Sequence, residues 1–265
     1  MKHISSRDNP QYKQLKLLCG PASAKKRGDL AAAEGIHLCQ AMLEQGIQPQ
    51  MCVLSDSALA HPEVQALLRA IDPAKVAMLQ LADKLFADLS SLENGVGVLC
   101  LLPVPRPRLP ERITDDAVVL DAVQDPGNLG SILRSAAAAG IRDVFCGAGS
   151  AQCWSPKVLR AGMGAHFVLR IHEQLDLTQL LAHAGIPVIA TSSHVQETVF
   201  EADLRSPRIW LFGNEGQGVS SVLLQRANLR LALPHLGKIE SLNVAACAAV
   251  CLFEQMRQRI MAQQR

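Results

Sequence analysis

The sequence predicts an α/β protein with two domains, of which the C-terminal one is built on a mostly parallel sheet. Alternating prolines in Pro103-Val-Pro-Arg-Pro-Arg-Leu-Pro110 forbid helix and favour an extended spacer. After this spacer, short apolar runs alternate regularly with helical or loop segments, which is typical of a parallel sheet covered on both faces. We therefore expect an N-terminal domain over residues 1–102, a linker over 103–115 and a second domain over 116–265.

The N-terminal domain is expected to contain three helices and two strands. Asn9-Pro10 opens an amphipathic helix, and further helices are expected over Ala31–Gln45 and Pro62–Ala70. Strands are expected over Met51–Leu54 and Val96–Leu102, the second of them buried. Together these elements predict a small α/β domain.

The C-terminal domain is expected to contain strands over Ala117–Asp121, Asp143–Cys146, Phe167–Ile171, Pro187–Thr191, Arg208–Phe212 and Leu229–Leu233. Gly147-Ala-Gly149 follows one of these strands and looks like half of a dinucleotide-binding fingerprint. Because Gln152 stands where the third glycine of that fingerprint should be, the sequence disfavours a nicotinamide-dependent enzyme.

Composition sets broader limits on the class of protein. The chain has 265 residues, 49% of them hydrophobic, which suffices for two separate cores. Its eight cysteines include no CxxC pair and lack the histidine partners of a zinc site, so we expect reduced thiols and no metal. Cys247 and Cys251 share one helical face, which leaves a metal or redox pair as the alternative to simple core packing. We see no signal peptide or membrane span and expect a cytoplasmic protein.

Positive charge is concentrated near the N-terminus, although the formal net charge is only +2. Residues 1–30 carry seven basic side chains against two aspartates, Asp8 and Asp29; the basic ones are Lys2, Arg7, Lys13, Lys16, Lys25, Lys26 and Arg27. Such a cluster can bind nucleic-acid phosphates by releasing counterions. A solvated helix face is the alternative. Lys25, Lys26 and Arg27 are the candidate nucleic-acid contacts.

Three short segments place small or polar residues at turns between apolar runs, where α/β domains bind ligands. The first is Asp125-Pro-Gly-Asn-Leu-Gly-Ser-Ile-Leu-Arg134. We expect Asn128 to cap a helix from about Leu129 to Ala139, with Arg134 near enough to address the same ligand. A surface arginine is the alternative, but the run Ala136–Ala139 predicts that this helix packs closely against another element.

The second segment, Phe212-Gly-Asn-Glu-Gly-Gln-Gly218, sets glycines around Asn214-Glu215 directly after a strand, which is typical of a ligand-binding loop. The third is Leu233-Pro-His-Leu-Gly-Lys-Ile-Glu-Ser-Leu-Asn243. We expect Ser241 to cap the terminal helix and Asn243 to lie in its first turn. Capping alone is the alternative role of these two residues.

In this order and spacing the three segments resemble the motifs of the SpoU (TrmH) family of RNA ribose methyltransferases, and the resemblance covers nearly the whole chain. Ile4-Ser-Ser-Arg-Asp-Asn-Pro10 and Glu34-Gly35 look like the family's small substrate-recognition domain, which has a ribosomal-protein-like α/β fold and binds RNA. Arg160-Ala-Gly-Met-Gly-Ala165 is similar to a further signature, with Gly162 where serine is usual. Ser131 replaces a common threonine, and His235 replaces an aliphatic residue or methionine.

The resemblance implies a catalytic domain with a deep trefoil knot, S-adenosylmethionine as cofactor, a homodimer, and methyl transfer to a ribose 2′-hydroxyl of ribosomal or transfer RNA. It implies Arg134 as the central catalytic residue within a network of Asn128, Glu215, Ser241 and Asn243. Cofactor contacts are expected at Thr191, Leu211, Gly213, Asn214, Gly216, Leu233, Ile239, Ser241 and Leu242. Arg160 joins Lys25, Lys26 and Arg27 as a candidate RNA contact.

The pKa of an arginine, above about 12, makes Arg134 a poor base, so we expect it to position groups and stabilise charge. Water, an RNA phosphate or Glu215 then remains as the proton acceptor. Two other classes remain open: a non-catalytic RNA-binding or ribosome-assembly protein with the same fold, and a base methyltransferase of the knotted superfamily. The complete set of Asn128, Arg134, Glu215 and Asn243 favours the ribose methyltransferase.

Overall fold

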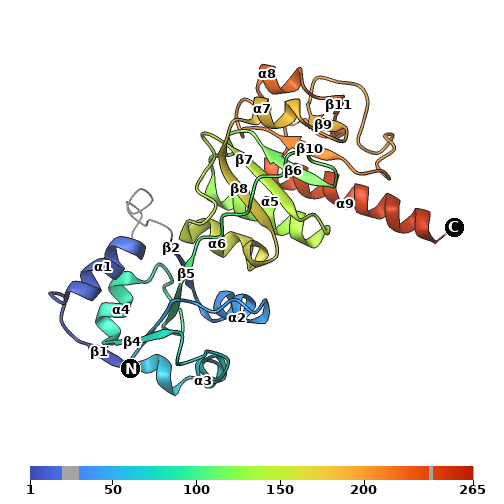
Figure 1. Ribbon diagram of the computed structural model, residues 1–265. Coiled ribbons are helices and arrows are strands. Elements are labelled where there is room, and N and C mark those ends of the chain that lie inside the picture. The colour runs from blue at the N-terminus through green and yellow to red at the C-terminus, as the bar shows by residue number, and fades with distance from the viewer. Residues whose placement is uncertain (20–29, 239–240, 265) are drawn as a thin grey trace. The chain divides into compact units, whose positions relative to one another are not determined.

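The computed structural model describes residues 1–19, 30–238 and 241–264 (Figure 1). The candidate RNA contacts Lys25, Lys26 and Arg27 and the candidate cofactor contact Ile239 lie outside the described residues. The chain divides into two compact units. One contains Met1–Pro105 and Trp154–Phe167, and the other contains Arg106–Cys153 and Val168–Arg265. The sequence division assigns residues 154–167 to the second domain, whereas in the structure they pack within the first unit.

The first unit contains a five-stranded sheet with strand order β1-β4-β3-β5-β2. The strands are β1 (Lys2–Ile4), β2 (Leu30–Glu34), β3 (Met51–Ser55), β4 (Ala77–Leu81) and β5 (Val98–Pro103). β1, β4 and β3 run parallel, while β5 is antiparallel to both of its neighbours. The helices are α1 (Pro10–Cys19), α2 (Ile36–Glu44), α3 (Pro62–Arg69) and α4 (Asp83–Leu89), with a 3-10 turn at Ser57–Ala60.

The expected helix over Ala31–Gln45 was wrong at its start. Residues Leu30–Glu34 form β2, which pairs antiparallel with β5, and α2 begins only at Ile36. Gly35, at φ 96°, turns the chain between the two elements. Because Ala31–Ala33 are buried in the sheet, tertiary packing outweighs the helix propensity of alanine.

The second unit contains a six-stranded sheet with strand order β11-β9-β10-β6-β7-β8, in which every neighbouring pair is parallel. The prediction of a mostly parallel α/β domain is confirmed. Its strands are β6 (Ala117–Leu120), β7 (Asp143–Gly147), β8 (Arg170–Leu175), β9 (Val188–Thr191), β10 (Ile209–Phe212) and β11 (Leu229–Leu231). β8 begins later than expected, because Ala165–Phe167 form a 3-10 turn.

Helices cover both faces of this sheet. The short helices α7 (Leu177–Ala182) and α8 (Ser221–Leu224) pack on the face that carries Val119, Phe145 and Leu211. On the other face, α5 (Pro126–Ala138) packs against the long α9 (Val244–Gln263). Successive strand residues point to opposite faces, so Trp210 meets α9, where its Nε1 donates to Gln255 Oε1 at 2.6 Å.

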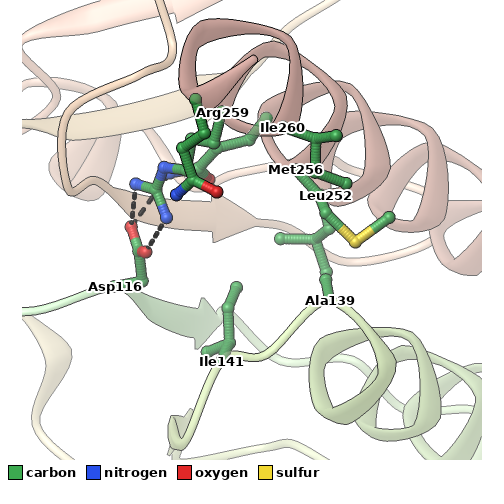
Figure 2. A pocket seen from close by; sticks show the side chains of 9 residues that line it. Asp116, Ala139, Ile141, Leu252, Met256, Arg259 and Ile260 are labelled. Carbon is green, nitrogen blue, oxygen red and sulfur yellow. Dashed lines mark hydrogen bonds and ion pairs between the residues drawn. The ribbon is translucent and has the colours of Figure 1, made fainter.

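A polar clamp holds the C-terminal half of α9 to the amino end of β6. Asp116 precedes β6 and accepts hydrogen bonds from Gln255 Nε2 (2.9 Å) and from the backbone N–H of Arg208 (2.9 Å). Arg259 donates to both oxygens of the Asp116 carboxylate, as Figure 2 shows. Beside this ion pair lies a cavity of about 90 Å³, lined on one side by the polar residues of the clamp and on the other by apolar side chains that include Ile141 and Leu252. The clamp therefore holds α9 at the amino ends of the strands, away from their carboxyl ends.

Candidate active site

The three segments singled out in the sequence meet at the carboxyl edge of the parallel sheet. The first follows β6 and leads into α5, the second follows β10, and the third leads into α9. β6 and β10 are hydrogen-bonded neighbours, so the loops after them emerge side by side. In open α/β sheets, ligands bind at this edge.

The carboxylate of Glu215 lies at the centre of the hydrogen bonds between these segments. Its Oε1 accepts from the backbone N–H of Asp125 (3.0 Å) and from Asn128 Nδ2 (3.1 Å). Its Oε2 accepts from the backbone N–H of Gln124 (3.2 Å), with a longer contact from Asn214 Nδ2 at 3.5 Å. The loop after β10 is thereby tied to the turn after β6.

A relay of amide groups connects this carboxylate to the start of α9. Asn243 Nδ2 donates to Asn128 Oδ1 at 2.9 Å, and Asn128 Nδ2 donates in turn to Glu215. Asn243 Oδ1 accepts from the N–H groups of Ala245 (2.9 Å) and Ala246 (3.3 Å) at the N-terminus of α9. All donors in this relay point toward the carboxylate, and the positive end of the helix dipole lies behind them.

These contacts determine the ionisation of Glu215. Partial burial raises the pKa of its carboxyl, but the hydrogen bonds from Asp125, Asn128 and Gln124 outweigh that effect and hold the pKa below its ordinary value of 4.5. Glu215 is therefore ionised at neutral pH, with both oxygens already occupied by donors. This arrangement favours an organising role over that of proton acceptor.

Two capping predictions were wrong. The N-cap of α5 is Asp125, whose Oδ1 accepts from the backbone N–H of Asn128 at 2.8 Å, and Pro126 occupies the first turn. The N-cap of α9 is Asn243, not Ser241. Ser241 is exposed and makes no hydrogen bond to any residue that the structure describes. The Asp125-Pro126 pair, a side-chain acceptor followed by proline at the first helical position, was the sequence signal for the true cap of α5.

The loop after β10 closes tightly on itself. Asn214 and Gly218 exchange two backbone hydrogen bonds of 2.9 Å, and Asn214 Oδ1 accepts from the N–H groups of Gly216 (2.9 Å) and Gln217 (3.2 Å). A Cβ on Gly213 would lie 2.0 Å from the carbonyl carbon of Gly218, so this position admits only glycine. The loop presents its backbone at the sheet edge.

Arg134 lies on the exposed side of α5 and makes no hydrogen bond or ion pair within the described ranges of the chain. Its helix packs against α9, and Ala136, two residues further along the helix, is fully buried. The guanidinium is thus available to a ligand rather than committed to the fold.

The candidate cofactor residues cluster at the ends of three adjacent strands. Thr191 ends β9, while Gly213 and Leu233 follow β10 and β11, the two neighbours of β9. Leu242 is partly exposed just before α9. By contrast, Leu211 is fully buried against α7 and α8, so only its backbone can face the site.

Sequence reasoning missed two further contributors to this edge. Cys247 on α9 has a lowered pKa, chiefly because of the neighbouring Cys251 thiol and also through the side chain of Thr191 at the end of β9. Asp121 Oδ2 accepts from the backbone N–H of Ser220 at 2.8 Å and fixes the far end of the β10 loop. Among the residues that the structure describes, no group of three or more His, Cys, Asp or Glu side chains could hold a metal ion.

The remaining candidate, Arg160, belongs to the first unit. It lies on α6 (Pro156–Gly162) and donates through Nη1 to the carbonyl oxygen (3.1 Å) and Oγ (2.5 Å) of Ser91. Arg160 thus already has protein partners. No helix within the described part of the chain is long and apolar enough to cross a bilayer.

The fold and the site define a class of protein. It is a parallel α/β domain in which a Glu–Asn–Asn relay joins three loops at the sheet edge, with an uncommitted arginine on the helix that follows the first loop. Residues 116–253 match the SpoU rRNA Methylase family, and the chain belongs to that family.

Curated relatives and solved structures match over almost the full length. An uncharacterized tRNA/rRNA methyltransferase of Synechocystis is 34% identical over 97% of this chain and 94% of its own length. The 23S rRNA (guanosine(2553)-2'-O)-methyltransferase RlmP of Bacillus subtilis is 29% identical over 96% of this chain and 98% of its own. The crystal structure of an AdoMet-bound rRNA methyltransferase from Sinorhizobium meliloti superposes with a TM-score of 0.84 at 26% identity, covering 97% of each chain.

Proposed function

We propose that this protein is an RNA 2′-O-ribose methyltransferase that uses S-adenosylmethionine and acts on ribosomal or transfer RNA. The observation that carries the proposal is the relay of Glu215, Asn128 and Asn243, together with the exposed Arg134 on α5, within the region that matches the family. A non-catalytic RNA-binding protein would have no need of this polar constellation. The named relatives that span the chain are methyltransferases.

The residues at the carboxyl edge fit S-adenosylmethionine, which supplies an electrophilic methyl group on a sulfonium. The loop 213–218 offers backbone groups that side chains do not cover, since a Cβ on Gly218 would meet nothing within 4 Å. The partly exposed Leu233 and Leu242 offer apolar surface to the adenine. Thr191, Gly213, Asn214 and Gly216 would complete the cofactor contacts, mainly through backbone.

The chain's own residues hold the ribose in place for attack. Arg134 binds the ribose hydroxyl or the adjacent phosphate and stabilises negative charge that develops on the 2′-oxygen. Asn128 and Glu215 hold the turn at the start of α5 against the β10 loop, and Asn243 holds the start of α9 against Asn128. The exposed Ser241 is left free to contact the cofactor. Methyl transfer would release the proton of the ribose hydroxyl, which water or an RNA phosphate would accept, because Glu215 has a lowered pKa and occupied oxygens. Most of the rate enhancement then comes from alignment.

In the proposed enzyme the segment after β11 threads through a loop to form a deep trefoil knot. Hydrogen bonds between α9 and the connection from β9 to β10 support this topology. Gln258 Nε2 donates to the carbonyl oxygen of Ala202 (3.0 Å), and Arg259 donates to those of Arg205 and Ser206 (3.0 Å each). The residues of the last helix are thus bonded to a loop that lies 53 to 56 positions earlier in the sequence.

The proposed enzyme works as a cytoplasmic homodimer that approaches the target nucleotide from both subunits. Apolar side chains exposed along α9 support a second copy as the partner, since Val250, Phe253, Ile260 and Met261 are each 37–48% exposed. In this proposal residues 1–102 form the ribosomal-protein-like RNA-binding domain, 103–115 the linker and 116–265 the methyltransferase domain, except for the segment 154–167, which packs within the first unit.

Methyl transfer from labelled S-adenosylmethionine into separated unmodified rRNA and tRNA tests the function, with the labelled nucleoside identified by mass. A 2′-O-methylnucleoside in one fraction is the expected result and selects the substrate class. A methylated base would instead assign the chain to base methylation. Cofactor binding without transfer to any RNA would favour the non-catalytic alternative.

The basic cluster has a separate test. Replacing Lys25, Lys26 and Arg27 with alanine is expected to weaken RNA binding and to flatten its dependence on salt concentration. An unaltered salt slope would identify the cluster as a solvated surface.

A further inference from the structure

The segment Trp154–Phe167 lies between β7 and β8 in the sequence, yet it packs within the first unit. Its helix α6 lies against β2, and a Cβ on Gly164 would be 2.9 Å from Ala41 Cβ, so the segment approaches α2 closely. The rings of Trp154 and His166 meet edge to face, 5.2 Å apart, and both side chains are buried. The segment is therefore an integral part of the N-terminal unit.

A polar relay anchors this segment. The carboxylate of Glu34, at the end of β2, is only 7% exposed and accepts from Ser90 Oγ (2.5 Å), Ser91 Oγ (2.5 Å) and the backbone N–H of Ser91 (3.1 Å). Ser91 Oγ also accepts from Arg160 Nη1 at 2.5 Å, and the Ser91 carbonyl oxygen accepts from the same nitrogen at 3.1 Å. A single hydroxyl thus bridges a buried anion on β2 and a cation on α6.

We infer that Arg160 is a positioning residue, not an RNA contact: through Ser91 and Glu34 it holds segment 154–167 on the N-terminal unit. The inference deepens the proposed function and rests on it where methyl transfer is the readout. Two of the sequence features that resemble the family, Glu34-Gly35 and Arg160–Ala165, are thereby joined through Ser91, and we call this contact the junction.

The junction matters because of chain connectivity. The backbone passes between the two units at Pro105–Arg106, Cys153–Trp154 and Phe167–Val168, three times rather than once. If segment 154–167 were released, only the proline-rich linker would join the RNA-binding unit to the transfer unit. Fewer tethers allow more relative orientations, which lowers the effective concentration of a bound ribose at the transfer site. Release should therefore lower kcat for RNA and leave cofactor affinity unchanged.

Arg160→Gln is the test variant, and Lys157→Gln is the matched control, because Lys157 is an exposed cation on the same helix. Acrylamide quenching of tryptophan fluorescence reports on the segment directly. The chain has two tryptophans, Trp154 in the segment and the fully buried Trp210 in the other unit. We expect Arg160→Gln to raise the quenching constant at least about twofold and Lys157→Gln to leave it unchanged. Ser91→Ala should raise it similarly, and the double variant should add little, since both changes break one relay.

The RNA readouts separate positioning from direct contact. With a transcript of 23S rRNA, Arg160→Gln should reduce kcat about tenfold while the affinities for RNA and S-adenosylmethionine stay within about twofold. The slope of log affinity against log salt should not change, whereas loss of a phosphate contact would reduce it by about one. Arg160→Lys, which keeps a donor, should restore part of kcat. A reduced salt slope with wild-type quenching would overturn the inference. If the wild type methylates no RNA, the quenching and double-variant results still decide the positioning role.

Discussion

Replacing Glu215 with glutamine tests the central relay, because it removes the negative charge while keeping the shape of the side chain. In the wild type, both carboxylate oxygens accept hydrogen bonds, from Asp125 N–H and Asn128 Nδ2 on one side and from Gln124 N–H on the other. A glutamine can offer only one oxygen. Its amide group must therefore point its own hydrogens at one of these sets of donors.

The magnitude follows from the bonds that change. In the best orientation the new carbonyl oxygen keeps the hydrogen bonds from the Asp125 N–H and from Asn128 Nδ2. The N–H of Gln124 then loses its acceptor. We take about 1.5 kcal/mol per hydrogen bond to the charged acceptor, the low end of the range, because Glu215 is exposed. The two retained bonds lose about half of that value when the acceptor becomes neutral. The total is about 3 kcal/mol, or a loss of roughly 150-fold in kcat/KM.

The assay is methyl transfer under kcat/KM conditions, with Glu111→Gln as the control because Glu111 is an exposed glutamate of the same unit. The control should keep wild-type activity. A loss of less than about threefold in Glu215→Gln would refute the view that the charge organises the site.

The pH dependence adds an independent check. Because the folded state lowers the pKa of Glu215 below 4.5, its stabilising effect is complete above that pH and disappears as the pH falls through the lower folded value. Wild-type activity should therefore show no Glu215 titration near neutral pH, and Glu215→Gln should flatten only the acid limb. A wild-type titration near pH 7 that the substitution removes would identify Glu215 as the proton acceptor instead.

Three further substitutions probe other parts of the domain. Arg134→Ala should lower methyl transfer at least about 100-fold while cofactor affinity stays within twofold. Arg142→Ala is the control, because Arg142 is also exposed. Wild-type activity in Arg134→Ala would show that Arg134 has no part in the mechanism. Gly213→Ala should weaken S-adenosylmethionine binding in calorimetry at least tenfold, since its methyl would meet backbone at 2.0 Å. Gly216→Ala keeps the backbone contact and has 3.6 Å to its nearest neighbour, so it should weaken binding much less; equal effects would contradict the loop geometry. Asp116→Ala should lower the free energy of unfolding in urea by about 3 kcal/mol, because it leaves a buried amide and a guanidinium without their acceptor; a change below 1 kcal/mol would refute the clamp.

The sequence was sufficient to predict most strands of the second unit but fewer of those in the first. Apolar runs such as Ala117–Leu120 and Ile209–Phe212 are buried on both faces, and that burial leaves a clear pattern. β1 and β4 were not predicted, because Lys2–Ile4 is short and mostly polar and Ala77–Leu81 contains no β-branched residue. The alanines of β2 carry no strand signal of their own, and pairing with β5 decided their conformation.

For the site, the sequence located the loops but not their hydrogen bonds. Asn128 and Asn243 are 115 residues apart, and no local rule joins them. The caps expected at Asn128 and Ser241 are in fact Asp125 and Asn243, and Asn128 instead uses its side chain in the long-range bonds to Glu215 and Asn243. The placement of residues 154–167 in the first unit likewise depends on long-range packing, which periodicity does not encode.

The relay also imposes an order on biosynthesis. A ribosome delivers Asn128 first, Glu215 second and Asn243 last, so a nascent chain can form its sheet and two of its loops while the amide oxygen of Asn128 still lacks its donor. Asn243 is the N-cap of α9, a helix of 20 residues that spans about 30 Å and carries Gln255 of the Asp116 clamp toward its other end. The protein should therefore acquire activity late in its maturation, after the last helix has been made and seated.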